Sequence, residues 1–273
     1  MTASVKAVSG QNDSSASVAP TAFDRKAAEV LRSFNTWAFK REQPTEPELL
    51  AQVVALRLWQ EAPISFVLYW GKGPRARIAD PDRLCLKYLD QMGKRIASAY
   101  EPGAQFHLCL TDTHARLNGH PERDIDTYFG DIAEEAGRHG MKSVRLAQLV
   151  ANTSAHPQPR ADAANDAMMA SLEKCAARWY RGGSNVRDGA RTYLEMNAVE
   201  SAAVAAHYRD TIFLTFNGRA YRGLFPTSMP VFYMYSLKRG TAVKPWFMDE
   251  NCSAFPDADA GGAERSGPGE QVA

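Results

Sequence analysis

The side chains best suited to chemistry follow two short apolar runs, Ile64–Tyr69 and Phe106–Leu110. After the first run comes a cationic, glycine-containing loop with Lys72, Arg75 and Arg77. Glycine lets the backbone approach an anion, and guanidinium forks match phosphate or carboxylate oxygens. The loop therefore predicts a phosphate site, with a solvated basic loop as the alternative. It has neither the Walker spacing nor Gly-x-Gly-x-x-Gly, which disfavours NAD and FAD.

The second run leads into a polar loop that holds Asp112, His114 and Asn118. If extended backbone continues past the run, Asp112 and His114 point to the same face. Asp112 would then orient the imidazole, and His114 would act as a general acid or base. Asn118 is a candidate substrate-binding residue. The alternative is a plain loop whose Asp112 and Asn118 cap turns. A metal is not expected, because Asp-x-His reverses the usual ligand order and no third ligand stands out.

Further candidates flank the aromatic segment Val231–Leu237. Arg219 and Tyr221 precede it and Lys238 follows it, and all three are candidate substrate-binding residues. Lys238 follows a strand end and is therefore expected on the ligand side of a sheet. An aromatic strand is more often part of a core, which is the alternative for the segment itself. The stretch Tyr180–Gly183, between two helical segments, is a weaker candidate for a lid or an anion-binding nest.

Alternating helical and strand-like segments must position these residues. Apolar residues at helical spacing predict helices over 23–39, 46–61, 81–100, 125–139, 161–178 and 190–208. Strands are expected over 64–69, 106–110, 144–150, 231–237 and, more weakly, 242–247, while 211–216 fits either a strand or a buried helix end. This alternation predicts a Rossmann-like α/β fold, mainly parallel with helices on both faces, and allows an antiparallel C-terminal edge. Parallel strands end at one edge of a sheet, so both loops are expected at one ligand site.

Bulk properties limit the function classes. The 273 residues predict a single α/β domain over 22–254 between polar, disordered tails at 1–21 and 255–273. A net charge of +1 argues against nucleic acid or a membrane surface as the partner. The chain has neither a membrane-length apolar run nor a signal-peptide core, so a cytoplasmic location is expected. Four dispersed cysteines are expected to be buried thiols, and the oligomeric state stays open.

The order of several short motifs resembles the isonitrile (isocyanide) synthase family of pyoverdine and dityrosine biosynthesis. The first half of the match consists of Phe66–Leu68, Gly71–Pro74, Asp80–Asp82, Tyr100–Ala104 and Thr111–Asp112. The second half consists of Ala220–Tyr221, Phe225–Pro226, Val231–Leu237 and Pro245–Trp246. The chain departs from the family at Gly73 and Arg75, and the histidines that follow the late strand and the Pro-Trp pair are replaced by Lys238 and Phe247.

The resemblance implies a Rossmann-like fold and an enzyme of secondary metabolism. In that family the amino group of an L-amino acid becomes an isonitrile, ribulose 5-phosphate supplies the carbon, and no metal or redox cofactor takes part. By this resemblance Lys72, Arg75 and Arg77 would hold the sugar phosphate, and Arg219 or Lys238 the amino acid carboxylate. Asp112 and His114 would move protons. The alternatives are a different transferase or lyase acting on another phosphorylated molecule, and a non-catalytic homologue with a degenerate site.

Overall fold

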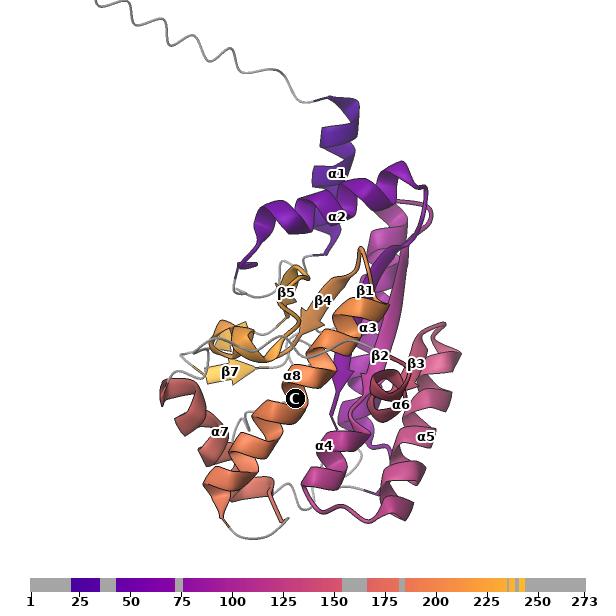
Figure 1. Cartoon of the computed structure of the whole chain (residues 1–273). Coiled ribbons are helices and arrows are strands. Elements are labelled where there is room, and N and C mark those ends of the chain that lie inside the picture. The colour runs from indigo at the N-terminus through magenta and orange to yellow at the C-terminus, as the bar shows by residue number, and fades with distance from the viewer. Residues whose placement is uncertain are drawn as a thin grey trace, which may run out of the picture.

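Five parallel strands form the central sheet, in the order β3-β2-β1-β4-β5 (Figure 1). The computed structural model describes residues 21–34, 43–71, 76–153, 166–181, 185–234, 236–238 and 241–243. The strands are β1 (Ile64–Trp70), β2 (Ala104–Leu110), β3 (Lys142–Arg145), β4 (Ile212–Thr215) and β5 (Val231–Tyr233). A separate antiparallel hairpin joins β6 (Ser236–Lys238) to β7 (Thr241–Val243). The parallel sheet confirms the predicted Rossmann-like fold and places the reversal of strand order between β1 and β4.

Helices cover both faces of the sheet. One face carries α1 (Ala22–Ser33), α2 (Pro47–Trp59), α3 (Asp80–Ala99) and α5 (Glu122–Arg138). The other carries α6 (Leu146–Ala151), α7 (Asp166–Trp179), α8 (Val186–His207) and the 3-10 helix η1 (Arg219–Leu224). The short helix α4 (Asp112–Leu117) follows β2 directly, so it stands at the carboxyl edge of the sheet.

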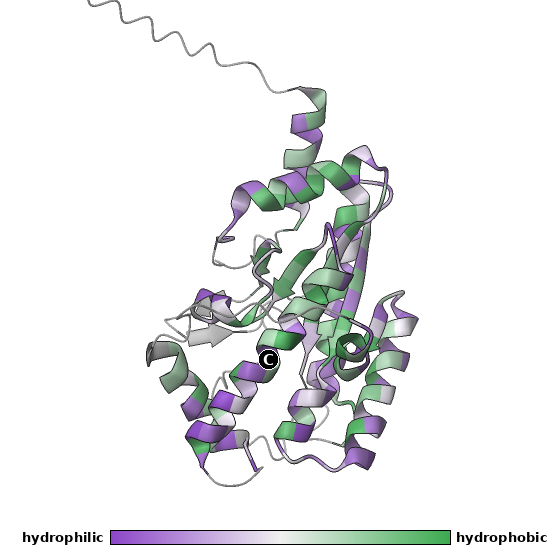
Figure 2. Cartoon of the chain, viewed as in Figure 1, coloured by the Kyte–Doolittle hydropathy of each residue, from purple (hydrophilic) through white to green (hydrophobic). Residues whose placement is uncertain are grey.

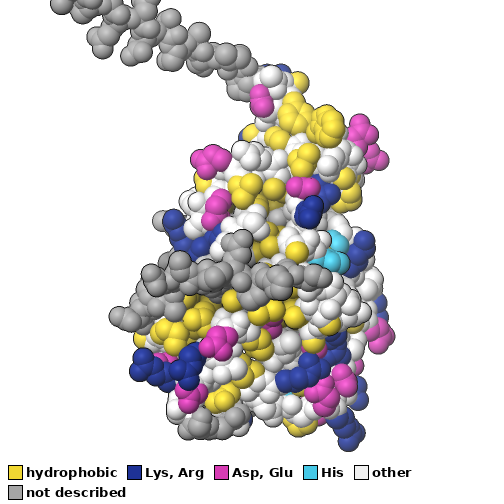
Figure 3. All heavy atoms as spheres, viewed as in Figure 1, with side chains coloured by type: hydrophobic (Ala, Val, Ile, Leu, Met, Phe, Trp, Pro, Cys, Tyr) yellow, Lys and Arg dark blue, Asp and Glu magenta, His cyan; other side chains and the backbone are white. Residues whose placement is uncertain are grey.

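The side-chain alternation of β1 divides the molecule into two cores. Phe66 and Leu68 pack with α1, α2, α3 and α5, whereas Val67 packs with α6, α7 and α8. Successive strand residues point to opposite faces, so a strand covered on both sides is apolar throughout. Figure 2 shows this, with apolar central strands and polar outer faces on the surrounding helices. Figure 3 shows one face of the surface, on which Lys and Arg side chains are interspersed with Asp and Glu side chains.

One sequence-based prediction of an element is wrong. The stretch 144–150 is not one strand, because β3 ends at Arg145 and α6 starts at Leu146. Leu146 and Leu149 are three residues apart and both buried, which suits a short helix. The antiparallel C-terminal pairing that the sequence allowed is found in the β6–β7 hairpin, whereas β5 pairs parallel with β4. Antiparallel pairing occurs only between β6 and β7 within the described chain.

The sequence also led to predictions about the chain ends, membrane-spanning segments and cysteines. The predicted tails 1–21 and 255–273 lie outside the described residues, apart from Thr21, which caps α1. In the ranges that the structure describes, no helix combines the length and apolarity needed to cross a bilayer. Cys85 and Cys109 are buried free thiols, and burial raises the pKa of Cys109 to about 12. Cys175 is half-buried, and Cys252 lies outside the described residues.

His107 makes the stability of the fold depend on pH. Burial, followed by the charge of Lys142, lowers its pKa from 6.5 to about 4. Unfolded His107 therefore binds a proton as the pH falls below 6.5, while folded His107 stays neutral until about pH 4. The folded state is therefore destabilised relative to the unfolded state as the pH falls from 6.5 to about 4. Because the ring is partly exposed, we expect the loss of stability to be about 1–2 kcal/mol.

His107→Phe removes the titrating group and keeps a ring against Tyr208, whose ring centroid lies 5.0 Å away. Urea unfolding at both ends of the window should show a smaller loss of stability in this variant. An equal loss in the variant and the native chain would assign the pH dependence to other groups.

Candidate active site

The polar segment after β2 is helical from its first residue, and this changes how its side chains are arranged. The Thr111 hydroxyl donates to the carbonyl of Trp70, which ties the end of β2 to the end of β1. Helix α4 then starts at Asp112. Residues two apart on a helix do not face each other. The prediction that Asp112 and His114 share a face was therefore wrong.

Asp112 joins two helices, and among the described residues its carboxylate bonds to Arg116 and Ala147 rather than to the imidazole. One carboxylate oxygen accepts from the guanidinium of Arg116 at 2.8 Å. The other accepts from the backbone N–H of Ala147 at 3.0 Å, in the first turn of α6. A carboxylate at a helix N-terminus satisfies an N–H that has no partner within the helix. Asp112 thus fixes α4 against α6 and does not orient His114.

The partner of His114 is Glu200, on the buried side of α8. The Nε2 atom of His114 lies 2.6 Å from one oxygen of Glu200, and only 6% of the histidine side chain and 1% of the glutamate side chain are exposed. The hydroxyl of Thr113 donates to the other oxygen of Glu200. Both oxygens of the carboxylate are therefore held, which fixes its position beside the ring.

This pairing determines the role of the second ring nitrogen. A carboxylate can only accept, so the proton of the neutral ring is on Nε2 and Nδ1 keeps its lone pair. Nδ1 is buried and has no hydrogen-bond partner among the described residues. A buried imidazole with one nitrogen bound to a carboxylate and the other open is the arrangement of a general base.

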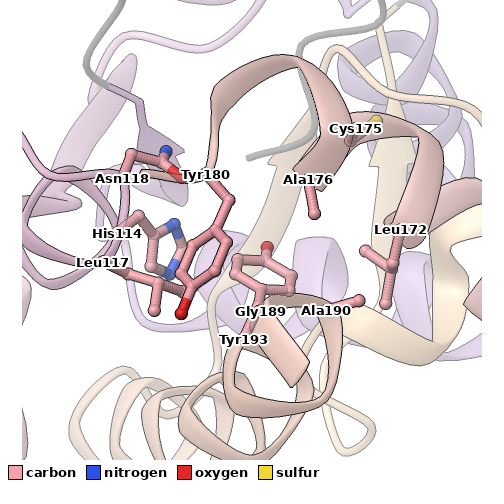
Figure 4. Close-up of a pocket in the computed structure, with 10 residues that line it drawn as sticks. All are labelled: His114, Leu117, Asn118, Leu172, Cys175, Ala176, Tyr180, Gly189, Ala190 and Tyr193. Atoms are coloured by element: carbon pink, nitrogen blue, oxygen red, sulfur yellow. The ribbon is translucent and has the colours of Figure 1, made fainter. Parts of the chain in front are cut away.

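His114 lines a pocket between α4, α7 and α8 (Figure 4). The pocket has a volume of about 60 Å³. Figure 4 shows two tyrosines, Tyr180 and Tyr193, beside the imidazole. The rings of Tyr193 and His114 are edge-on, with their centroids 5.0 Å apart. The remaining lining residues are mostly apolar or small: Leu117, Asn118, Leu172, Cys175, Ala176, Gly189 and Ala190. The cavity beside the imidazole is therefore small, and its walls are mostly apolar or aromatic.

Further buried polar groups lie near this pair on α8 and β1. Tyr69 lies edge-on to His114, with ring centroids 6.2 Å apart, and its hydroxyl is 3.4 Å from that of Ser201. Burial raises the pKa of Tyr69 well above its usual value, so it remains a neutral phenol. Asn197, one turn before Ser201, is fully buried, and its amide has no hydrogen-bond partner within the described ranges.

The structure brings together only part of the predicted site. His114 and Asn118 line the pocket, and Asp112 supports α4. Arg77 is largely exposed and pairs with Asp131 of α5. Lys72 and Arg75 lie outside the described residues, so the predicted meeting of the cationic loop with His114 stays a prediction.

Tyr221 and Arg219 are not among the described residues that line this pocket. Tyr221 is buried, and its hydroxyl lies 2.9 Å from that of Ser171. Arg219 is exposed on η1. Lys238 belongs to β6, and its side chain is outside the described part of the chain. Tyr221 therefore supports the second core, and substrate binding by Arg219 and Lys238 remains a prediction.

Sequence reasoning missed Glu200 and Tyr193, and it singled out Tyr180 only as part of a candidate lid or anion-binding nest. A signal for Glu200 was present. Tyr193, Asn197, Glu200, Ser201 and Val204 recur three or four apart and are all buried on α8. A carboxylate on such a stripe is rarely buried without a specific partner. The partner, 86 positions earlier, could not be identified from the sequence alone.

No protein-family model matches this chain, and no curated protein matches it either. Among solved structures, it is similar to the PvcA protein from Pseudomonas aeruginosa, with a TM-score of 0.57 and 17% identity over 81% of this chain and 87% of that one. Tyrosyl-tRNA synthetase complexed with L-tyrosine, from Archaeoglobus fulgidus, matches more loosely. Its TM-score is 0.38 at 14% identity over 76% and 63% of the two chains. What the chain shares with PvcA is the fold, a Rossmann-like parallel sheet with helices on both faces.

Proposed function

We propose that this protein is an isonitrile-synthase-like enzyme of secondary metabolism, which converts the amino group of an L-amino acid to an isonitrile with ribulose 5-phosphate as the carbon donor. The ordered motifs in the sequence support this proposal. So does the fold shared with PvcA, because a Rossmann-like fold is what the resemblance to isonitrile synthases implies. The observation that carries the proposal is the open Nδ1 of His114, which Glu200 holds beside an aromatic pocket.

The first step of such a reaction requires a base. The substrate amine must lose a proton before its lone pair attacks the ketone carbon of the sugar phosphate. Nδ1 of His114 would take that proton, and the Glu200 carboxylate, 2.6 Å from Nε2, would stabilise the resulting imidazolium. The imidazolium would then return the proton to the hydroxyl that leaves as water when the imine forms.

The pocket supports an assignment of the substrate groups. Its walls include Tyr180, Tyr193 and Leu172, which suits an aromatic or apolar amino acid side chain. Among the described residues that line it, none is a lysine or an arginine. We therefore assign the phosphate to Lys72, Arg75 and Arg77 after β1, and the amino acid carboxylate to Arg219 or Lys238.

The test is a product assay with matched variants. The protein is incubated with ribulose 5-phosphate and L-tyrosine, L-tryptophan or a wider panel of amino acids, and isonitriles are sought by mass. We expect a product from the native chain and roughly a hundred- to ten-thousand-fold less from His114→Gln. No isonitrile across the whole panel would overturn the proposed reaction. Thermal stabilisation by nucleotides but not by pentose phosphates would instead favour a different transferase or lyase.

A further inference from the structure

Tyr180 lies immediately after α7 and forms a wall of the pocket in front of His114 (Figure 4). Its backbone N–H still donates to Ala176, so it continues the helical path by one residue. The guanidinium of Arg181 donates to the carbonyls of Tyr180 and Arg178. These bonds satisfy carbonyls at the end of α7 and hold the segment in a defined conformation.

Two glycines from other elements make room for this segment. A Cβ atom on Gly189, the fourth residue of α8, would lie 2.6–2.8 Å from three atoms of the Tyr180 ring. A Cβ on Gly119, after α4, would lie 2.9 Å from the Cβ of Arg181. Glycine is unfavourable within a helix, so a glycine in α8 needs a packing reason. The Tyr180 ring, lying directly against the helix backbone, supplies that reason.

We infer that Tyr180 is a specificity-determining residue, which limits the groups that reach Nδ1 of His114, and that Gly189 is the residue that seats its ring. The ring is held between α7 and α8 and acts as a fixed wall, which differs from the lid considered for this segment. The inference rests on the proposed function only in taking this pocket as the one that receives the amino acid side chain.

The first test measures access to His114 and needs no substrate. Diethyl pyrocarbonate carbethoxylates unprotonated imidazole nitrogen, and mass spectrometry of peptides reports the rate at each histidine. Close-packed walls exclude such a reagent, so we expect slow reaction at native His114 and about tenfold faster reaction in Tyr180→Ala. Tyr180→Phe keeps the ring and should stay slow. Exposed His207 serves as the internal reference, with the same rate in every variant.

Gly189→Ala tests whether Gly189 makes room for the Tyr180 ring. Its new methyl group cannot coexist with the ring in place, so Tyr180 must move and His114 should again react faster. Gly130→Ala in α5 is the matched control, because a Cβ there meets nothing within 4 Å and His114 should stay slow. Equal His114 rates in the native chain and Tyr180→Ala would overturn the inference, whether or not Gly189→Ala folds.

A second test uses the proposed reaction. Tyr180→Ala should shift kcat/KM toward larger amino acid side chains relative to the native chain, while Tyr180→Phe should preserve the order of preference. An unchanged order in Tyr180→Ala would overturn the specificity role. If no isonitrile forms with any variant, the proposed function fails, and the carbethoxylation rates still decide whether Tyr180 closes the pocket.

Discussion

Glu200→Gln is expected to lower kcat of the proposed reaction by roughly a hundred- to ten-thousand-fold. The amide keeps the size and shape of the carboxylate but loses the negative charge 2.6 Å from His114 Nε2. The imidazolium that forms during proton transfer is then no longer stabilised. If the amide N–H groups face the ring, the imidazole proton also moves to Nδ1 and the base is lost. Steady-state rates and thermal unfolding together measure this effect.

Two further variants make this prediction specific to the pair. Glu195→Gln changes an exposed glutamate of the same helix and should leave the rate unchanged. The double variant His114→Gln with Glu200→Gln should lose no more activity than His114→Gln alone, because residues that act as a unit are not additive. Fully additive losses, or a Glu200→Gln rate close to that of the native chain, would contradict the role given to Glu200.

Asp112→Ala is expected to destabilise the fold by about 2–4 kcal/mol and to change kcat less than about tenfold. The substitution leaves Arg116 without one of its carboxylate partners and removes the acceptor for the Ala147 N–H. It also leaves a space where a carboxylate of only 3% exposure had been. Denaturant unfolding measures the stability, and single-turnover assays on the folded fraction measure the rate.

The control for Asp112 is another aspartate–arginine pair. The Asp126 side chain is 67% exposed, and its carboxylate lies 3.4 Å from the Arg145 guanidinium. Asp126→Ala should therefore lower the free energy of unfolding by less than about 1 kcal/mol. A large loss of rate in Asp112→Ala with unchanged stability would restore the catalytic role that its position next to β2 first indicated.

The fold was predictable where local pattern and burial agree. β1 and β2 are short apolar runs bounded by turns, and their ends were placed within two residues. The pattern failed where a long-range contact decides the structure. Residues 146–151 are apolar enough for a strand, yet α6 forms there, with Asp112 accepting an N–H in its first turn. No local feature of the segment reports a cap that lies 35 positions away.

The candidate site was predictable only at one residue of its central pair. His114 stands directly after a strand, at the edge where parallel sheets bind ligands. Its neighbour in sequence, Asp112, was the natural choice of partner, but the turn into α4 directs that carboxylate to α6. Glu200 reaches His114 because α8 packs across α4, and this packing depends on the whole second core.

The proposed function depends on Glu200 holding His114 by Nε2, which leaves Nδ1 of this pocket-lining residue without a hydrogen-bond partner among the described residues. NMR of isotope-labelled imidazole nitrogens, assigned with His114→Gln, reads the protonation of each ring nitrogen in the native chain. In the neutral ring we expect the proton on Nε2 and a lone pair on Nδ1. A neutral ring with its proton on Nδ1 would contradict this arrangement.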